Sequence, residues 1–371
     1  MKIPFVDLRA QYLSIKNDID SAIENVIIET AFIGGKYVMS FKEDFQNAYD
    51  VKHCIPVANG TDAIYIVLKM LGIGDGDEVI TASNSWISTS ETISQTGAKP
   101  VFVDIDPTYY TIDPEKIKEK ITPKTKAIIP VHLYGQMADL TSINAICKAN
   151  NLYLIEDCAQ SHFSELNGVK AGQTGIASTF SFYPGKNLGA YGDAGCILTQ
   201  NDELAEKVAM FANHGALTKH NHLIEGINSR MDGLQAAILS VKLPHLHDWT
   251  EARIVNAKKY NKGLEGVGDI QLPEVRINSR HTFHLYVIKT KKRDALKAYL
   301  ERHGVETAIH YPVALPLMPA YSRFGSDSLE YPIGADHVNK ILSIPMYPEL
   351  SDDQINYIVK IIKSFYADMA C

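Results

Sequence analysis

Apolar residues near the start of the chain follow the three-to-four-residue spacing of amphipathic helices. Residues 10–29 show this spacing, and the pair Gly34-Gly35 ends it. A second helical pattern then runs through Phe41, Phe45 and Tyr49. The sequence therefore predicts a leading arm and a helix that pack on the part of the chain that follows.

From residue 53 onward, short apolar runs alternate with helical patterns. Strands are expected at 53–58, 77–82, 100–105, 126–133, 152–160, 178–183 and 196–199, and helices at 59–71, 86–96, 114–121, 140–149 and 204–211. The runs are apolar almost throughout, which is typical of strands buried on both faces. We therefore expect an α/β domain whose mostly parallel sheet is covered by helices and binds ligands at the carboxyl ends of its strands.

A long helical pattern from about residue 231 to 265, interrupted near Pro244, leads to the last third of the chain. Strands are expected there at 282–288 and about 306–310, and helices at 293–303 and 352–365. The expected division is an N-terminal arm and large domain, residues 1–250, and a small C-terminal α+β domain, residues 251–371. A length of 371 residues agrees with two domains.

Composition narrows the functional classes. Apolar residues make up 46% of the chain and charged residues 21%, which is typical of a folded globular protein. The formal net charge of −7, without any basic block, gives no support to nucleic-acid binding. The first residues lack the apolar core of a signal peptide, and no apolar run approaches the length of a membrane span. We therefore expect a cytoplasmic enzyme with neither a nucleic-acid nor a membrane partner.

The spacing of cysteines and histidines indicates no disulfide framework and no metal site. The histidine pairs His220/His222 and His245/His247 have no neighbours that complete a metal-like spacing. No G-x-G-x-x-G follows an early strand, which excludes a Rossmann dehydrogenase. The cysteines are odd in number and form no C-x-x-C pair, so we expect reduced, mostly buried thiols at Cys54, Cys147, Cys158, Cys196 and Cys371.

Lys186 is the first candidate for chemistry. It lies between Gly185 and a glycine-dense segment, after the run at 178–183 and before the run at 196–199. This places it on a tight loop between two strands, where a partly desolvated amine can lose its proton and attack a carbonyl group. The alternative is a surface lysine beside a glycine turn.

A second candidate is the start of the helix that follows the strand at 53–58. Gly60 and Thr61 open this helix, and a helix N-terminus offers free N–H groups to an anion such as phosphate. The carboxylate of Asp62 would then have to point away from the anion. The alternative is an ordinary Asn-Gly turn with Thr61 as a helix cap.

Two further candidates lie at strand ends. Trp86 follows the strand at 77–82, and its ring could stack on a flat heteroaromatic ligand or could simply belong to the core. Asp157 ends the buried run at 152–160, where a carboxylate needs a cationic partner. The alternative for Asp157 is to cap a following helix.

These motifs resemble those of one family along essentially the whole chain. Three motifs carry the resemblance: the segment Ser181-Phe182-Tyr183-Pro184-Gly185-Lys186, the turn Asp193-Ala194-Gly195 and the motif Glu156-Asp157-Cys158-Ala159-Gln160. They are similar to motifs of the sugar aminotransferases that use pyridoxal phosphate (PLP), the DegT/DnrJ/EryC1/StrS family. The element from Asn228 to Ala237 also resembles a family element. This chain departs from the pattern at Ala194, where glycine is usual, and at Ile227, where tyrosine is usual.

The resemblance implies an aspartate aminotransferase fold, that is, fold type I of PLP enzymes, with a mostly parallel seven-stranded sheet in the large domain and a smaller C-terminal α+β domain. It implies that Lys186 carries PLP and shuttles the proton. It also implies a homodimer with shared active sites. The remaining implied roles are contacts to the ring nitrogen from Asp157, to the ring hydroxyl from Gln160, to the pyridine ring from Trp86, to the phosphate from Gly60, Thr61 and Ser181, and to the partner's phosphate from Asn228.

The substrates that the resemblance implies are L-glutamate and a nucleotide-linked keto-deoxysugar, in the synthesis of amino sugars for a surface polysaccharide such as lipopolysaccharide O-antigen, or for a glycosylated metabolite. Trp86 and the following Ser90-Glu91-Thr92 favour amination at C-3 over C-4. A sugar dehydratase of the family has histidine in place of the lysine, so Lys186 argues against it. A non-catalytic regulator would be free to lose Lys186 or Asp157, and both are present.

Overall fold

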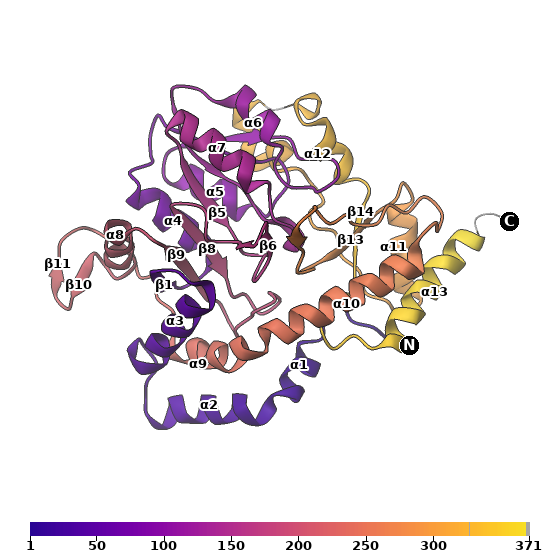
Figure 1. Cartoon of the computed structure of the whole chain (residues 1–371), viewed down its shortest axis with the longest axis horizontal. Helices are drawn as coiled ribbons and strands as arrows, with labels where there is room; N and C mark the ends of the chain where they lie inside the picture. Colours follow the sequence, from indigo (N-terminus) through magenta and orange to yellow (C-terminus); the bar gives the residue numbers. More distant parts are fainter. Residues whose placement is uncertain (326, 369–371) are drawn as a thin grey trace.

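A seven-stranded sheet forms the centre of the structure (Figure 1), a computed structural model that describes residues 1–325 and 327–368. Its strands lie in the order β1 (His53–Val57), β9 (Gly195–Thr199), β8 (Ala177–Ser181), β5 (Tyr153–Asp157), β4 (Thr125–Ile129), β2 (Glu78–Ala82) and β3 (Lys99–Val103). Only β9 runs against its neighbours, β8 and β1. The expected α/β fold with a mostly parallel seven-stranded sheet is confirmed.

Helices cover both faces of this sheet, which explains the nearly continuous apolar runs. Val79 and Ile155 face a core that also contains residues of α4 (Gly60–Met70) and α8 (Asp202–Ala212). Ile80 and Leu154, one position along, face the opposite core, as strand geometry requires. The remaining helices that follow strands are α5 (Ser88–Gln95), α6 (Pro114–Lys120) and α7 (Leu140–Asn150).

The N-terminal arm consists of α1 (Leu8–Ser14), α2 (Lys16–Ile28) and α3 (Gly35–Tyr49). The prediction of one continuous helix at 10–29 is wrong at Ile15. The backbone of this residue is not helical (φ −127°, ψ 24°) and separates α1 from α2. On α3, Phe45 packs edge-to-face against Phe180 and Phe182, with ring centroids 5.4 and 5.3 Å away. The helix therefore supports the end of β8, directly before the loop that carries Lys186.

The interrupted helix near Pro244 is confirmed as α9 (Gly233–Lys242), a 3-10 turn and α10 (Leu246–Leu264), which lead to a second core (Figure 1). This core contains the antiparallel pair β13 (Tyr286–Lys289) and β14 (Ile341–Ile344), α11 (Arg293–Arg302) and α13 (Asp352–Asp368). Ile3 also lies in it and pairs with Val305. The division of the chain at residue 250 stays a prediction.

Three expected strands end or fail where the backbone makes other bonds. The strand expected at 126–133 ends at Ile129 because Pro130 has no N–H group to donate. The strand expected at 282–288 begins only at Tyr286, since Thr282 and Leu285 donate to carbonyl groups of the loop at 134–135. Residues 306–310 form no strand, only an isolated bridge between Ala308 and Ser343.

Several short elements were not expected. They are β6 (Glu165–Leu166), β7 (Val169–Lys170), β10 (Ala216–Thr218), β11 (Asn221–His222), β12 (Ser279–Arg280) and α12 (Pro332–His337). Four of the cysteines, Cys54, Cys147, Cys158 and Cys196, are buried free thiols as expected, and Cys371 lies outside the described residues. In the described part of the chain, no helix has the length and apolar character needed to cross a membrane.

Candidate active site

A cavity of about 560 Å³ lies at the carboxyl ends of the parallel strands, where such sheets bind ligands. Seven of the eight predicted site residues line it: Gly60, Thr61, Trp86, Asp157, Gln160, Ser181 and Lys186. The eighth, Asn228, is exposed and pairs through its backbone with Asn213 instead. The structure thus brings together residues that are more than a hundred positions apart in the sequence.

Lys186 lies on a compact loop between β8 and β9. Its backbone N–H donates to the carbonyl of Tyr183 at 2.8 Å, and the N–H of Ala190 donates to that of Phe182 at 2.8 Å. A side chain at Gly189 could not fit, since a Cβ atom there would lie 2.3 Å from the carbonyl oxygen of Pro184. The loop therefore has one tightly specified conformation, which fixes the backbone from which the lysine side chain extends.

The environment of Lys186 lowers the pKa of its amine. Its side chain is partly buried, and burial lowers the pKa of Lys186 to about 8, although the charge of Asp157 acts in the opposite direction. With that pKa, about one amine in ten is uncharged at pH 7, far more than for a solvated lysine. The alternative of an ordinary surface lysine does not fit a residue that lines the cavity.

Asp157 ends β5 with its carboxylate turned toward the cavity and 5% of the residue exposed. The carboxylate accepts hydrogen bonds from the Thr89 hydroxyl at 2.8 Å and from the Ala159 N–H at 3.1 Å. Both of these hydrogen-bond donors are neutral. The chain enters turns and β6 after β5, so the alternative that Asp157 caps a following helix is wrong. A buried carboxylate with neutral donors only is suited to a cationic ligand.

The N-terminus of α4 opens onto the same cavity. Asn59 is its cap and accepts from the N–H of Asp62 at 2.8 Å, so the alternative in which Thr61 is the cap is wrong. The N–H groups of Gly60 and Thr61 have no acceptor within the helix. Asp62 is not among the cavity residues, which removes the objection to an anion at this point.

Gly60 and Ser181 lie in contact. A Cβ atom at Gly60 would lie 2.8 Å from the Cβ of Ser181. The hydroxyl of Thr61 forms a hydrogen bond of 2.7 Å with that of Ser88, at the start of α5. Free N–H groups, a positive helix end and hydroxyl groups converge here, which is the composition of a phosphate site.

Gln160 and Trp86 surround the remaining part of the cavity. Gln160 accepts from the N–H of Tyr134 at 2.7 Å and donates to the hydroxyl of Tyr311 at 3.1 Å, which fixes its orientation. Trp86 is 56% exposed, and its ring centroid lies 5.5 Å from that of Tyr311. The alternative that Trp86 belongs to the core is therefore wrong.

A comparison with known families decides the class of this site. The sequence model of the DegT/DnrJ/EryC1/StrS aminotransferase family matches residues 13–363. The chain belongs to this family. It is a transaminase, and its cofactor is pyridoxal phosphate.

Relatives of this aminotransferase match it over nearly their whole lengths. A pleiotropic regulatory protein of Geobacillus stearothermophilus is 45% identical, with 100% of both chains covered. A dTDP-3-amino-3,6-dideoxy-alpha-D-galactopyranose transaminase of Aneurinibacillus thermoaerophilus is 42% identical, with 98% of this chain and 99% of the relative covered. A crystal structure of DesV from S. venezuelae superimposes with a TM-score of 0.96 at 36% identity, with 98% of both chains covered, which confirms the aminotransferase fold.

The residues of the cavity suit this cofactor. A phosphate group requires N–H donors, which the start of α4 offers beside a contact at Gly60 too close for any side chain. A pyridinium nitrogen requires a carboxylate, and Asp157 has only neutral hydrogen-bond partners. An aldehyde requires an amine with a lowered pKa, as Lys186 has.

The aminotransferase cavity also contains residues that the sequence did not single out, among them Thr89, Arg253 and His284. His284 contacts the amide oxygen of Asn187 at 3.2 Å, and burial lowers its pKa well below the usual range. Arg253 of α10 is buried, and its guanidinium donates to the carbonyl of Met346 at 2.8 Å and to two carbonyls of the segment before β13. Thr89 and Arg253 each fit the polar pattern of a surface helix position, so no sequence signal distinguished them.

His310 and Tyr311 line the cavity as well. Burial lowers the pKa of His310 to about 4, so its imidazole is neutral at pH 7. The hydroxyl of Tyr134 donates to the carbonyl of His310, which joins the segment at 310–311 to the 3-10 turn that follows β4. Met346 of the second core lines the cavity too.

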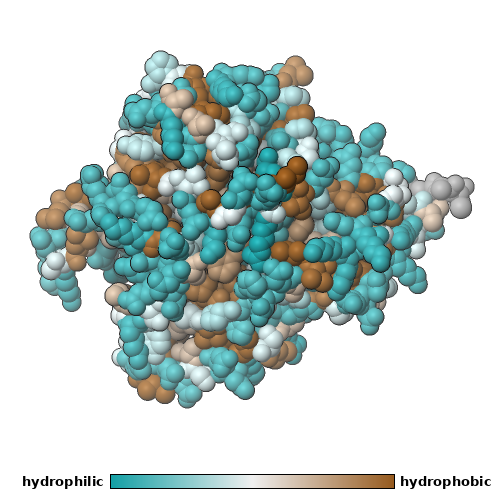
Figure 2. Space-filling model, viewed as in Figure 1, coloured by the Kyte–Doolittle hydropathy of each residue, from teal (hydrophilic) through white to brown (hydrophobic). Residues whose placement is uncertain are grey.

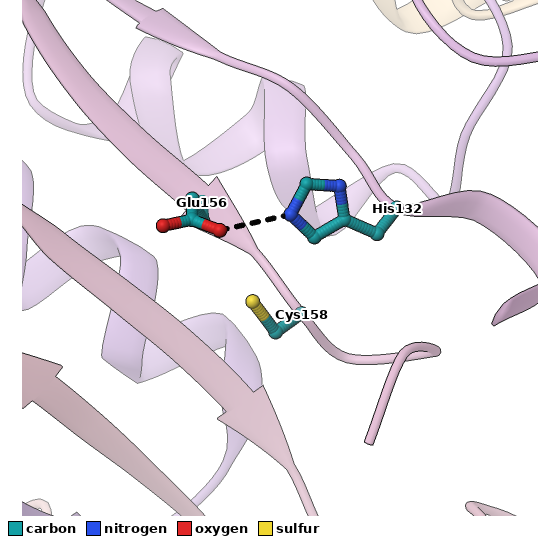
Figure 3. A group of neighbouring side chains, drawn as sticks. All are labelled: His132, Glu156 and Cys158. Carbon is teal, nitrogen blue, oxygen red and sulfur yellow. Dashed lines mark hydrogen bonds and ion pairs between the residues drawn. The ribbon is translucent and has the colours of Figure 1, made fainter. Parts of the chain in front are cut away.

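His132, Glu156 and Cys158 lie close together (Figure 3), and residues of these types can bind metal ions. Their hydrogen bonds indicate a different role. The Glu156 carboxylate accepts from the His132 imidazole at 3.0 Å and from the N–H groups of Gly172, Thr174 and Gly175 at 2.7 to 2.8 Å. The other imidazole nitrogen accepts from the N–H of Ala138 at 3.1 Å. This network holds the loop at 172–175 against β5.

Proposed function

We propose that the protein transfers an amino group from L-glutamate to a nucleotide-linked keto-deoxysugar with its ketone at C-3. The observation that carries this proposal is the convergence of Lys186, Asp157 and the N-terminus of α4 on one cavity. The name of the relative from A. thermoaerophilus supports a 3-amino sugar nucleotide as the product. Biosynthesis of an amino sugar for a surface polysaccharide such as lipopolysaccharide O-antigen is the proposed use.

In this proposal the cofactor is bound by residues of the cavity. Lys186 is its covalent attachment point, and Asp157 pairs with the ring nitrogen. The ring hydroxyl is bound by Gln160, the ring face by Trp86, and the phosphate by Gly60, Thr61 and Ser181. When bound, PLP acts as an electron sink for the substrate carbon and as the carrier of the amino group.

The side chains of the protein supply proton transfer and charge. With the cofactor and the amino donor bound, the Lys186 amine would accept the proton released by the donor's α-carbon and would give it back to complete the transfer, and a pKa of about 8 suits both directions near neutral pH. Thr89 and the Ala159 N–H donate hydrogen bonds to the Asp157 carboxylate and orient it, so that it can pair with a protonated ring nitrogen. The imidazoles of His284 and His310 are neutral because burial lowers their pKa, so these two side chains can form hydrogen bonds with the substrate but add no charge to the cavity.

We further propose a homodimer in which Asn228 reaches the partner's phosphate site. Two observations support this arrangement. Asn228 is exposed and outside the cavity of its own chain. Apolar side chains are also exposed nearby, in the region of the β10–β11 hairpin (Leu217, Leu223 and Ile224) and in the turn between α2 and α3 (Ile28, Phe32 and Ile33). Figure 2 shows apolar surface at the edge of the molecule where this hairpin lies.

Hybrid dimers test the shared site. Lys186→Ala and Asn228→Asp should each inactivate the homodimer, the first by loss of the amine and the second by repulsion of the phosphate. If sites are shared, a purified hybrid of the two variants has both lesions in one site and one intact site, so about half of the wild-type activity returns. A hybrid as inactive as both parents contradicts the shared site.

A regulatory role is the second candidate, because the relative from G. stearothermophilus is named a pleiotropic regulatory protein. A regulator without catalysis has no use for a lysine and a carboxylate that face the same cavity. Lys186 and Asp157 are both present here with their hydrogen-bond and charge environments. We therefore favour the enzyme, acting in the cytoplasm, where thiols such as the four buried cysteines stay reduced.

A substrate panel tests the proposed reaction. Purified protein is supplied with PLP, L-glutamate and dTDP-, UDP- and GDP-linked 3-keto or 4-keto sugars, and 2-oxoglutarate formation is followed. Turnover with a 3-keto sugar nucleotide is expected. Preference for a 4-keto sugar would correct the position of amination, and no turnover with any sugar nucleotide, by protein that binds PLP, would overturn the substrate class.

A further inference from the structure

Helix α9 contacts the loop that carries Lys186 through two side chains. Lys242 donates from its Nζ to the carbonyl of Gly189 at 2.7 Å. Gln235 accepts from the backbone N–H of Tyr191 at 2.9 Å. The two residues are seven positions apart, which places them two turns apart on one face of the helix. Two side chains of one helix thus bind the same short stretch of loop.

Lys242 is an unusual residue for its position. It is 0% exposed, and its Nζ donates to a backbone carbonyl rather than to a carboxylate. Besides the carbonyl of Gly189, its ammonium group faces the ring of Tyr191, 4.1 Å from the centroid. A buried amine costs free energy, and an apolar residue of the same length would fill the space but would leave the carbonyl without a donor. The hydrogen bond to the loop is the specific contribution of the lysine.

The loop and the start of the helix are both held by further contacts. Gly189 cannot move toward Pro184, because its backbone already lies against the Pro184 carbonyl. The N-terminus of α9 is fixed in turn, since the N–H of Gly233 donates to the carbonyl of Phe32 at 2.7 Å. The two residues between Lys186 and Gly189, Asn187 and Leu188, are buried, and Asn187 donates to the carbonyl of Thr282 at 3.1 Å. A displacement of Gly189 is therefore expected to reach Lys186, three residues earlier.

We propose that Lys242 and Gln235 are positioning residues that hold residues 189–192 so that the Lys186 side chain extends into the cavity. The proposal rests on the proposed role of Lys186, but its first test does not. A rigid support behind a reactive side chain keeps the reacting atom within the narrow range that catalysis requires.

Hydrogen exchange on the full-length holoenzyme provides that test. The variant Lys242→Met removes the donor and keeps the length of the side chain, and Gln235→Leu removes the acceptor. Both should accelerate exchange of the Ala190 and Tyr191 amides by about tenfold or more, because the loop opens more often. Lys242→Arg, which can still donate to the carbonyl, should restore much of the protection.

Lys289→Met is the matched control. Lys289 is also a buried lysine beside an aromatic ring, 5.2 Å from the centroid of Tyr110, but it lies on β13 away from the loop. This control should leave exchange at 189–192 unchanged even where its melting temperature falls as far as that of Lys242→Met. Equal exchange in wild type and Lys242→Met, or equal acceleration by the control, overturns the proposal.

A second readout connects the loop to the cofactor. With cofactor-free protein, covalent attachment of added PLP to Lys186 should be slower by about tenfold in Lys242→Met than in Lys289→Met. If wild-type Lys186 is never modified, the proposed function fails while the exchange result still decides the support of the loop. If Lys242→Met does not fold, the comparison of Gln235→Leu with Lys289→Met decides it.

Discussion

Gly60→Ala is the substitution that tests the phosphate site most locally. The added Cβ atom would lie 2.8 Å from the Cβ of Ser181 and 3.2 Å from its Cα. Two carbon atoms prefer a separation of about 3.5–4.0 Å, so α4 and the end of β8 must move apart by roughly 1 Å. The substitution therefore separates the two elements whose donors are proposed to bind the phosphate together.

The expected effect is larger on cofactor affinity than on stability. Overpacking costs about 1–3 kcal/mol, and the higher helix propensity of alanine offsets up to ~1 kcal/mol of it. Loss of one hydrogen bond to the charged phosphate costs about 1.5–3 kcal/mol. The Kd for PLP should thus rise about ten- to hundredfold, since each 1.4 kcal/mol corresponds to a factor of ten.

The assay is a fluorescence titration of PLP in the Lys186→Ala background, where binding is reversible and depends on noncovalent contacts. Gly74→Ala is the control, because a Cβ atom there would lie at an ordinary 3.4 Å from the nearest atom. The reasoning is refuted if Gly60→Ala and Gly74→Ala bind PLP with equal affinity, since the phosphate would then lie elsewhere.

Three further predictions concern the reacting groups. Asp157→Asn removes the charge at nearly constant volume. The single-turnover half-reaction with glutamate should therefore slow strongly, while the melting temperature changes little. If the variant is largely unfolded but its folded fraction reacts at the normal rate, Asp157 has a structural role instead. Thr89→Val removes the 2.8 Å hydrogen bond to Asp157 and should slow the same half-reaction about tenfold. The control is Thr92→Val on the same helix, which should not slow the reaction because the Thr92 hydroxyl donates to backbone carbonyls. Equal rates in both variants contradict the assignment. The rate of PLP attachment to cofactor-free protein should rise with pH and level off above pH 8, since the uncharged Lys186 amine reacts and its pKa is lowered to about 8; an inflection near that of free lysine would show a solvated amine.

The sequence predicts the sheet well because burial on both faces leaves a local signature. The run that contains Leu154 and Ile155 is apolar at successive positions, since the two side chains face different cores. Lys186 and Asp157 were identifiable for a related reason, because each follows directly on such a run. Parallel strands bring their carboxyl ends to one edge of the sheet, so residues at those ends meet there.

Other features depend on contacts that leave no local signature. Thr89 becomes a partner of Asp157 only because β2 and β5 place α5 beside the strand end. Lys242 occupies a helix position where a lysine is usually solvated, and only the packed structure shows that its amine is buried on the loop. The backbone of Ile15 leaves the helical region although its side chain continues the apolar pattern. Tertiary packing decides each of these cases.

Reduction with borohydride tests the central claim most directly. Lys186 and Lys242 both have a pKa lowered to about 8 by burial, but of these two lysines only Lys186 lines the cavity. The holoenzyme should therefore absorb visible light, lose this colour on reduction and carry the mass of the cofactor on the peptide that contains Lys186. A label on the peptide that contains Lys242, or active protein that carries no label at all, would contradict the account.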